Sequence, residues 1–282
     1  MEEEFHNHMR IPWHDYTRKS LGHPITEASL SEKASIIGRT GIMLLSCGTG
    51  AWRVRSSMNT LARELGITCT ADIGLLSIEY TCIDGGDCYT ESLCLFNTGV
   101  NTSKLYRMEL FVNKFATNCK KMSGDELHTL LDQIHEIHGF YSPPFLGLAA
   151  AVACCAFTFL LGGGPIEMFC AFLGAGAGNY LRAKMNQHHL TLFLCTAASV
   201  ALACVVYTIS FMALKSGFDV SIHHQAGYIC SMLFIIPGFP FITSGIDLAK
   251  LDMRSGMERL TYAIIIIAVA TLTAWMLALV LH

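Results

Sequence analysis

The side chains best suited to chemistry follow two closely spaced prolines near the carboxyl end of the chain. Pro237 and Pro240 each lack an amide donor and clash with the preceding turn, so an α-helix must break there. Within a lipid bilayer, backbone groups freed by such a break persist only inside a helix bundle or beside a water-filled cavity. Hydroxyls and a carboxylate follow the break directly. The candidates for a solute path are Pro237, Gly238, Pro240, Thr243, Ser244, Gly245 and Asp247.

This group of residues could bind and orient a small polar solute. The backbone dipoles exposed at the break would attract an anionic group, as the broken helices of many transporters do. The hydroxyls of Thr243 and Ser244 would form orienting hydrogen bonds, and Asp247 would act as a proton-linked or gating group. Two alternatives stay open, namely a kink with a purely structural role and, for Asp247, an anchoring role at the cytosolic edge of the membrane.

Residues for catalysis or metal binding do not form a recognisable motif. The sequence contains no GxSxG, HExxH, phosphate-loop or dinucleotide-binding glycine pattern. His128, His135 and His138 lie on one side of an expected helix, but a seven-residue step along a helix is about 10 Å, too far for the first two to share one ion. A polar helix face is the favoured interpretation. We therefore expect no catalytic residues, no bound metal and no cofactor, and the chain is not expected to be an enzyme.

The charged residues divide the chain into two parts. Of its 282 residues, 52% are hydrophobic and 15% are charged, whereas an ordinary soluble domain carries about 25% charge. Residues 1–144 hold 13 Lys and Arg and 17 Asp and Glu, while residues 145–282 hold only six and five. This composition excludes a disordered chain, and the net charge of −3 excludes a strongly basic nucleic-acid binder. The sequence therefore predicts a cytosolic domain, 1–144, followed by a transmembrane helical domain, 145–282.

The transmembrane domain is expected to be an α-helical multi-pass bundle of about five spans. A helix needs about 20 apolar residues to cross a bilayer, with about 17 as the lower limit. The second apolar segment is short and contains Glu167 near its start, so a re-entrant or strongly packed helix is an alternative there. The five segments are Phe145–Leu161, Pro165–Leu181, Leu190–Leu214, Gly227–Ile246 and Leu260–Leu281.

Basic residues set the expected orientation of these spans. Lys and Arg concentrate in cytoplasmic loops, and five of them follow the second and fourth segments, whereas only Lys215 follows the first and third. The start of the chain also lacks the apolar stretch of a signal peptide. We therefore expect a multi-pass protein with a cytoplasmic amino terminus. The expected topology anchors are Arg182, Lys184, Arg254 and Arg259, together with Lys250.

Small residues recur along the second segment at the spacing of a helix–helix contact. Ala171, Gly174, Ala175 and Gly178 would let the backbone of a neighbouring helix approach closely in lipid. Helix packing is the favoured role of these residues, and lining a transport path is the alternative.

The cytosolic part has the pattern of a small α+β domain. Apolar residues repeat at helical spacing through Thr26–Leu65, and Gly48-Thr49-Gly50 is expected to split this segment into two helices. Ser29 and Glu32 match a capping box at its start. The expected strands are Ile67–Asp72, Leu75–Ile83 and Cys88–Phe96, the last two joined by a glycine hairpin, and further helices are expected at Leu105–Phe115 and Ser123–Ile137.

Several of these segments together resemble the bacterial threonine/serine exporter (ThrE) family. The stretch Ile236–Leu248, followed by Arg254–Arg259, is similar to the family's signature. Gly41–Leu65, Gly99–Leu105 and Asn179–Arg182 resemble its first helical region, its post-hairpin turn and the end of its second span. The chain is most similar to those members of the family that form a separate subunit.

The resemblance implies an exporter of small polar metabolites, either amino acids such as Thr and Ser or dicarboxylates, in the bacterial inner (plasma) membrane. Transport would be driven by the proton gradient. Because long members of the family carry a second membrane half, a small multi-span membrane subunit would complete the transporter, and a homo-oligomer is a further arrangement. The alternative functions are a membrane-anchored enzyme, or a sensor, whose chemistry lies in residues 1–144.

Overall fold

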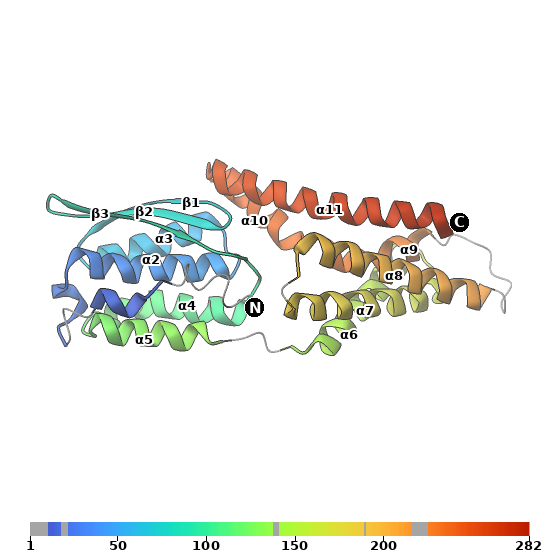
Figure 1. Cartoon of the computed structure of the whole chain (residues 1–282), viewed down its shortest axis with the longest axis horizontal. Coiled ribbons are helices and arrows are strands. Elements are labelled where there is room, and N and C mark those ends of the chain that lie inside the picture. Colours follow the sequence, from blue (N-terminus) through green and yellow to red (C-terminus); the bar gives the residue numbers. More distant parts are fainter. Residues whose placement is uncertain (1–10, 18–21, 138–140, 189, 216–224, 282) are drawn as a thin grey trace. The chain divides into compact units, whose positions relative to one another are not determined.

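A computed structural model shows a chain that divides into two compact units (Figure 1). The N-terminal unit comprises Met1–Gly139 and Phe239–Leu260, and the helical unit comprises Phe140–Gly238 and Thr261–His282. The segment Phe239–Leu260 thus packs with the first part of the chain, although it lies within the expected transmembrane domain. The described residues are 11–17, 22–137, 141–188, 190–215 and 225–281.

The N-terminal unit contains the expected helices and strands. The long helical segment is split where the glycines predict it, into α2 (Leu30–Ser46) and α3 (Ala51–Glu64), and three strands follow. The remaining elements are η2 (Trp13–Thr17), η3 (Ile25–Glu27), β1 (Thr68–Ile73), β2 (Ser77–Asp84), β3 (Asp87–Cys94), α4 (Thr102–Lys114), η4 (Phe115–Cys119), α5 (Gly124–His135), α10 (Gly238–Ala249) and the first turns of α11 (Met253–Leu281).

The three strands form an antiparallel sheet in the order β1-β2-β3. Asp84 pairs with Asp87 at the end of β2 and β3, and the tight turn between them contains Gly85 with a φ of +63°, which glycine adopts without steric cost. Helices α2 and α3 pack against the sheet, and α4 and α5 lie on the other side of these two helices (Figure 1). The expected α+β arrangement of this unit is therefore confirmed.

Helix α2 forms the centre of the N-terminal unit. Its residues from Glu32 to Leu45 are all buried, because the sheet lies on one side and α5 on another. The hydroxyl of Tyr80 on β2 reaches the helix backbone and donates a hydrogen bond to the carbonyl of Ala34 at 3.0 Å. A Cβ atom on Gly38 would lie 2.3 Å from that hydroxyl oxygen, so only glycine allows this close approach.

The expected capping box at the start of α2 is wrong. Ser29 is the N-cap residue, but its side chain makes no capping hydrogen bond and lies 3.1 Å from the hydroxyl of Ser31 instead. Glu32, the expected partner, is buried with its carboxylate directed at Gly124. A complete capping box forms at α5, where Ser123 accepts from the amide of Glu126 and the Glu126 carboxylate accepts from the amide of Ser123.

The helical unit contains the most apolar elements of the chain. Helices α6, α8 and α11 are long and apolar enough to cross a membrane, and α9 together with α10 meets the same test as a broken pair. The second expected span, α7, is not among the candidates, because glycines and terminal basic residues lower its hydropathy. The described residues therefore contain three to four candidate spans rather than five. The elements of this unit are α6 (Pro143–Leu160), α7 (Pro165–Gln187), α8 (Leu192–Lys215), α9 (Gln225–Ser231), η5 (Leu233–Ile235) and the remainder of α11.

Helix α7 packs between α6 and α8 through its small residues. A Cβ atom on Gly174 would lie 2.7 Å from the carbonyl oxygen of Ala203 on α8. A Cβ on Gly178 would lie 2.7 Å from the carbonyl oxygen of Ser199, also on α8. Ala171 and Ala175 are fully buried on the same helix. These contacts show α7 backbone against α8 backbone, the geometry that small residues permit.

The expected helix break at Pro237 is confirmed. Helix α9 ends at Ser231, a short 3₁₀ turn follows, and residues 236–237 are not helical before α10 begins at Gly238. Pro240 lies in the first turn of α10, where the missing amide donor costs no intrahelical hydrogen bond. The carbonyl of Phe234 accepts a hydrogen bond of 3.2 Å from the Arg182 guanidinium. This side chain thus supplies a hydrogen-bond donor for a carbonyl near the helix break.

Candidate functional site

The segment Phe239–Leu260 forms a helical hairpin in the N-terminal unit. Helix α10 and the start of α11 are joined by a tight turn in which Leu251 has a φ of +63°. The hydroxyl of Ser244 donates a 2.8 Å hydrogen bond to the carbonyl of Gly256 across the hairpin. A Cβ on Gly256 would lie 2.7 Å from the Leu248 side chain, so the two helices are in close contact. The hairpin contains most of the residues expected to form the solute path.

Asp247 is the most buried polar residue of the hairpin. Its side chain has no exposed surface, and its Oδ2 atom lies 3.3 Å from Nε of Arg259 on α11. The same oxygen accepts hydrogen bonds from the hydroxyl of Ser255 at 3.0 Å and from the amide of Ala51 at 3.2 Å. The latter bond satisfies a free amide at the start of α3, whose N-cap residue Gly50 has no side chain to do so.

Arg259 completes the cluster from the other side. It is 2% exposed, and its two terminal nitrogens donate to the carbonyls of Gly48 at 3.2 Å and Thr49 at 2.8 Å. These carbonyls follow the end of α2. The guanidinium thus lies where the negative end of α2 attracts a cation, and the Asp247 carboxylate lies where the positive end of α3 attracts an anion. The ion pair is favourably oriented toward both helices.

Two glycines in the loop between α2 and α3 allow close approaches, and one of them, Gly50, makes room for this ion pair. A Cβ on Gly50 would lie 2.8 Å from Oδ1 of Asp247. Gly48 has a φ of +82°, and a Cβ there would lie 3.1 Å from the carbonyl oxygen of Gly99. The loop that the sequence marks only as a helix interruption is therefore the binding surface for the hairpin.

Further contacts surround the buried pair. Asp252 in the turn of the hairpin pairs with Arg55 on α3, and Arg254 pairs with Asp72 on β1. The carboxylate of Glu258 accepts a 2.6 Å hydrogen bond from the amide of Leu75. The Lys250 ammonium lies 4.5 Å from the ring centre of Trp52, within cation–π range. Both the rim and the centre of the hairpin thus bind the N-terminal unit.

The other candidates for the solute path occupy different positions. Thr243 is buried, and its hydroxyl donates to the carbonyls of Phe239 at 2.9 Å and Pro240 at 3.1 Å within its own helix. Gly245 is exposed, and a Cβ there would have no neighbour within 4 Å. The structure therefore brings Ser244 and Asp247 to the buried side of α10 and places Gly245 on its exposed side.

Sequence reasoning missed two parts of this cluster. Arg259 was expected only as a marker of a cytosolic loop, whereas the structure shows it as the cationic partner of Asp247. Ser255 was not singled out at all, although it lies one helical turn before Arg259 and accepts a 3.0 Å hydrogen bond from its Nε. That spacing of four residues was the available signal. Among the other anchors, the Lys184 ammonium lies 5.7 Å from the Tyr180 ring centre.

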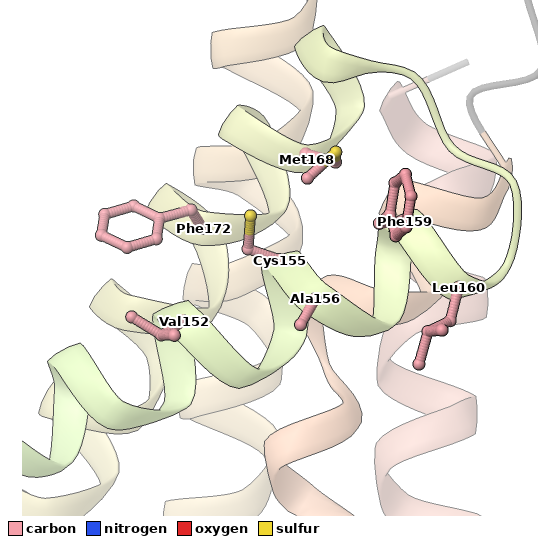
Figure 2. Close-up of a pocket in the computed structure, with 7 residues that line it drawn as sticks. All are labelled: Val152, Cys155, Ala156, Phe159, Leu160, Met168 and Phe172. Carbon is pink, nitrogen blue, oxygen red and sulfur yellow. The ribbon is translucent and has the colours of Figure 1, made fainter.

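The helical unit contains an apolar pocket between α6 and α7 with a volume of about 530 Å³ (Figure 2). Figure 2 shows Val152 and Phe159 on α6 and Met168 and Phe172 on α7 among the side chains that line it. Its lining offers no charged group that could bind a polar solute.

The histidines of α5 do not converge on a metal site. His128 is fully buried between Ser35 and Arg39 of α2, and burial lowers its pKa to about 3. His135 lies 3.3 Å from the Lys104 ammonium, and His138 lies outside the described residues. Within the described ranges, no group of three His, Cys, Asp or Glu side chains is placed to hold a metal ion.

The chain is similar to two named proteins over most of its length. The chain is 26% identical over 244 residues to a protein of Escherichia coli (strain K12) named "Probable succinate transporter subunit YjjP". The aligned region covers 83% of this chain and 91% of that protein. The protein of the same name from Klebsiella aerogenes is 25% identical, with 83% and 90% covered. No solved structure matches the chain significantly.

The family comparison covers nearly the whole chain. Residues 35–282 match the ThrE family, whose description is "Putative threonine/serine exporter". The match begins within α2 and includes the later helices of the N-terminal unit, the hairpin and all the candidate spans. Membership of this family implies a membrane transport protein rather than an enzyme. The chain belongs to the threonine/serine exporter (ThrE) family.

Proposed function

We propose that this chain is one subunit of a proton-coupled secondary exporter of small polar metabolites in the bacterial inner (plasma) membrane. Family membership supports export of amino acids such as Thr and Ser, and the names of the two YjjP relatives favour a dicarboxylate. A carboxylate group is common to both classes of substrate. The substrate class is therefore a small molecule with at least one carboxylate.

The proposed topology has five crossings and a cytoplasmic amino terminus. Three crossings are α6, α8 and α11, and the broken pair α9–α10 is the fourth. Helix α7 is the fifth, supported by its packing between the two candidate spans α6 and α8. Arg182 and Lys184 near the end of α7, and the basic residues of the hairpin turn, would then lie on the cytoplasmic side.

The helix break is the proposed place of solute binding. Broken helices expose backbone dipoles that can bind a carboxylate and a counter-ion in turn. Pro237 lies in the break, Gly238 begins α10 directly after it, and Pro240 prevents the two helices from joining into a continuous one. Thr243 and Ser244 would orient the solute when the hydroxyls exchange their present backbone acceptors for it.

Asp247 is the proposed gating residue, and its buried contact with Arg259 is the observation that carries the proposal. The pair fixes the hairpin to the ends of α2 and α3. The hairpin continues along the chain into α9 on one side and into the remainder of α11 on the other. A movement of the broken helix must therefore either carry α2 and α3 with it or break the hydrogen bonds of Asp247 to Ala51 and of Arg259 to Gly48 and Thr49.

A second, small multi-span membrane subunit is the proposed partner. The word "subunit" in the names of both relatives supports an assembly of more than one chain. Exposed apolar side chains on α6 and α11, such as Phe159 and Trp275, provide surface for a neighbouring helix or for lipid. A homo-oligomer of this chain is a further arrangement within the same proposal.

The experiment that tests this function is efflux from intact cells. Cells that lack this chain and its partner are loaded with labelled threonine, serine or succinate, and release is followed with and without the two genes. We expect slower release of at least one compound in the deletion strain and recovery when both chains are restored. Equal release of every compound in all strains would overturn the proposal.

A further inference from the structure

Arg182 is a partly buried cation of the helical unit. It lies near the end of α7, which packs between the candidate membrane spans α6 and α8. Its guanidinium donates a hydrogen bond of 3.2 Å to the carbonyl of Phe234. Within the described part of the chain, no aspartate or glutamate pairs with it. Charged side chains among membrane helices are costly and commonly mark substrate or ion pathways.

The carbonyl that Arg182 contacts is one that the helix break leaves free. In a continuous helix the carbonyl of Phe234 would accept from the amide of Gly238, four residues later. That amide instead donates to the carbonyl of Ile236 at 2.9 Å, and residues 236–237 are not helical. The Arg182 guanidinium supplies the missing donor. Its side chain is therefore bound to the broken segment itself.

The packing of Phe234 fixes this segment against α7. A Cβ on Gly178, one helical turn before Arg182, would lie 2.8 Å from Cζ of Phe234. The ring of Phe234 thus contacts the backbone of α7, while its carbonyl contacts the Arg182 side chain. These two contacts place the guanidinium directly beside the helix break.

The hydrogen bond to Phe234 uses only part of the guanidinium. An arginine side chain has five N–H donors in a rigid planar fork, and this bond involves one terminal nitrogen, Nη1. The Nη2 and Nε atoms have no hydrogen-bond acceptor among the residues that the structure describes. Two parallel N–H groups match the two oxygens of a carboxylate, and such bidentate pairs are strong. The remaining donors of Arg182 therefore suit a carboxylate ligand.

The neighbours of the guanidinium do not neutralise its charge. The titratable side chains that interact with it are Tyr262 on α11 and Cys195 on α8. Thiols and phenols are neutral near pH 7. A buried charge without an opposite charge is unfavourable, and an anionic ligand would compensate it. This setting differs from that of Arg259, whose charge is already paired with Asp247.

We propose that Arg182 binds a carboxylate of the exported solute beside the helix break. This inference rests on the proposed function, and it names the residue that recognises the group common to both substrate classes. One edge of the guanidinium holds the Phe234 carbonyl and the other holds the solute, so Arg182 connects the solute to the broken helix. In the proposed topology this end of α7 faces the cytoplasm, the side from which an exporter takes up its solute.

The first test measures selectivity for a carboxylate in proteoliposomes that contain the full chain and its partner subunit. Flux of labelled succinate, threonine or serine is competed with the same unlabelled acid or with its amide. The preference for the acid over the amide should fall at least tenfold in Arg182→Gln and less in Arg182→Lys, which keeps the charge but loses the planar fork. A merely structural role would weaken both competitors alike.

Lys184→Gln is the matched control for this test. Lys184 is an exposed cation on the same helix, and its ammonium lies 5.7 Å from the Tyr180 ring centre. Its loss removes one positive charge near Arg182 and should leave the preference for the acid within twofold of the wild type. An acid preference in Arg182→Gln equal to that of the wild type would overturn the inference.

A second measurement uses the unaltered chain. Methylglyoxal reacts with guanidinium groups and leaves a hydroimidazolone, which mass spectrometry detects at each arginine. Saturating succinate, threonine or serine should slow the labelling of Arg182 at least fivefold, and the corresponding amide should not. Arg254, which is about half exposed, should react at the same rate throughout. Labelling of Arg182 that is absent, or that is unaffected by every acid, would contradict a carboxylate site there.

The two failures can be told apart. If wild-type proteoliposomes transport none of the candidate solutes, the proposed function is wrong, and the labelling experiment still decides whether Arg182 binds a carboxylate. If the wild type transports a solute and Arg182→Gln keeps the same preference for the acid, the exporter remains and only the role of Arg182 is overturned.

Discussion

The Oδ2 atom of Asp247 lies 3.3 Å from Nε of Arg259, in a buried ion pair that contacts both the loop after helix α2 and the start of helix α3. The Asp247 carboxylate accepts from a backbone amide of α3, and the Arg259 guanidinium donates to backbone carbonyls after α2. Removing either side chain would leave the charge of the other buried without its ionic partner. The pair therefore joins the hairpin Phe239–Leu260, which the sequence assigns to the transmembrane domain, to helices α2 and α3.

Removing the charge of Asp247 should destabilise the protein strongly. Asp247→Asn leaves the Arg259 guanidinium buried without its carboxylate, and loss of one partner of a buried pair costs about 3–5 kcal/mol. Arg254→Gln is the control, because Arg254 and Asp72 are about half exposed and such pairs contribute about 0–1 kcal/mol. Denaturant unfolding of the detergent-solubilised full chain measures both costs. Similar losses for the two variants would show that the buried pair has no special role.

The coupling between the two charges can be measured directly. A double-mutant cycle of Asp247→Asn and Arg259→Gln should give a non-additive term of about 0.5–3 kcal/mol, because the two residues are in contact. Additive effects would contradict a direct interaction.

Two glycines next to Asp247 should respond in opposite directions to alanine. Gly50→Ala places a Cβ 2.8 Å from the Asp247 carboxylate and should cost about 1–3 kcal/mol through overpacking. Gly245→Ala, on the exposed side of α10, has open space and should stabilise the helix by about 0.5–1 kcal/mol. The shift in thermal unfolding temperature distinguishes them, and a stabilising Gly50→Ala would mean that the carboxylate does not lie against the loop.

Helix packing in the helical unit gives an independent test. Gly178→Ala directs a methyl group toward the carbonyl oxygen of Ser199, 2.7 Å from the new Cβ, and should lower stability by about 1–3 kcal/mol. Gly164→Ala, at the N-cap of α7, meets no atom within 4 Å and should be nearly neutral. Thermal unfolding in one detergent compares the pair, and equal behaviour would argue against the close α7–α8 contact.

The attachment of Trp13–Thr17 to α5 should depend on pH. The hydrogen bonds of His14 to Asp125 and Asp132, at 2.6 and 2.8 Å, raise the pKa of His14 above its usual value of 6.5. Its contribution to stability is therefore complete below pH 6.5 and is lost as the pH rises through the higher pKa of the folded state. Hydrogen–deuterium exchange of the Trp13–Thr17 peptide, corrected for intrinsic rates, should increase with pH in the wild type.

His14→Gln provides the control for that prediction. This variant retains a polar side chain but cannot take up a proton, so exchange of the Trp13–Thr17 peptide should be fast and independent of pH. Identical pH profiles for the variant and the wild type would show that His14 does not control the attachment.

Local patterns in the sequence were sufficient to predict the elements of the fold. Proline chemistry located the break at Pro237, and glycine located both the α2–α3 division and the hairpin between β2 and β3. These features depend on a few neighbouring residues. The capping box was misplaced because Glu32 is drawn into the core beside Gly124, a tertiary contact that overrides a local motif.

The geometry of the candidate site could not be predicted in the same way. The sequence singled out Asp247 and Arg259 separately, but their pairing depends on the folding of the hairpin. Their common surface, the loop Gly48–Gly50, lies about 200 residues earlier in the chain. No periodicity connects positions so far apart. The second expected span, α7, does not meet the length and hydropathy test for a membrane helix, because its small residues serve packing and lower its hydropathy at the same time.

The most direct measurement of the central claim is solute release from proteoliposomes that contain the purified chain and its partner subunit. Vesicles are loaded with labelled succinate, threonine or serine, and release is followed after a pH gradient is imposed. We predict that release of at least one of these compounds exceeds that from empty vesicles and falls when the gradient is collapsed with an uncoupler. Release equal to that of empty vesicles for every compound would contradict the assignment of this chain to a proton-coupled exporter.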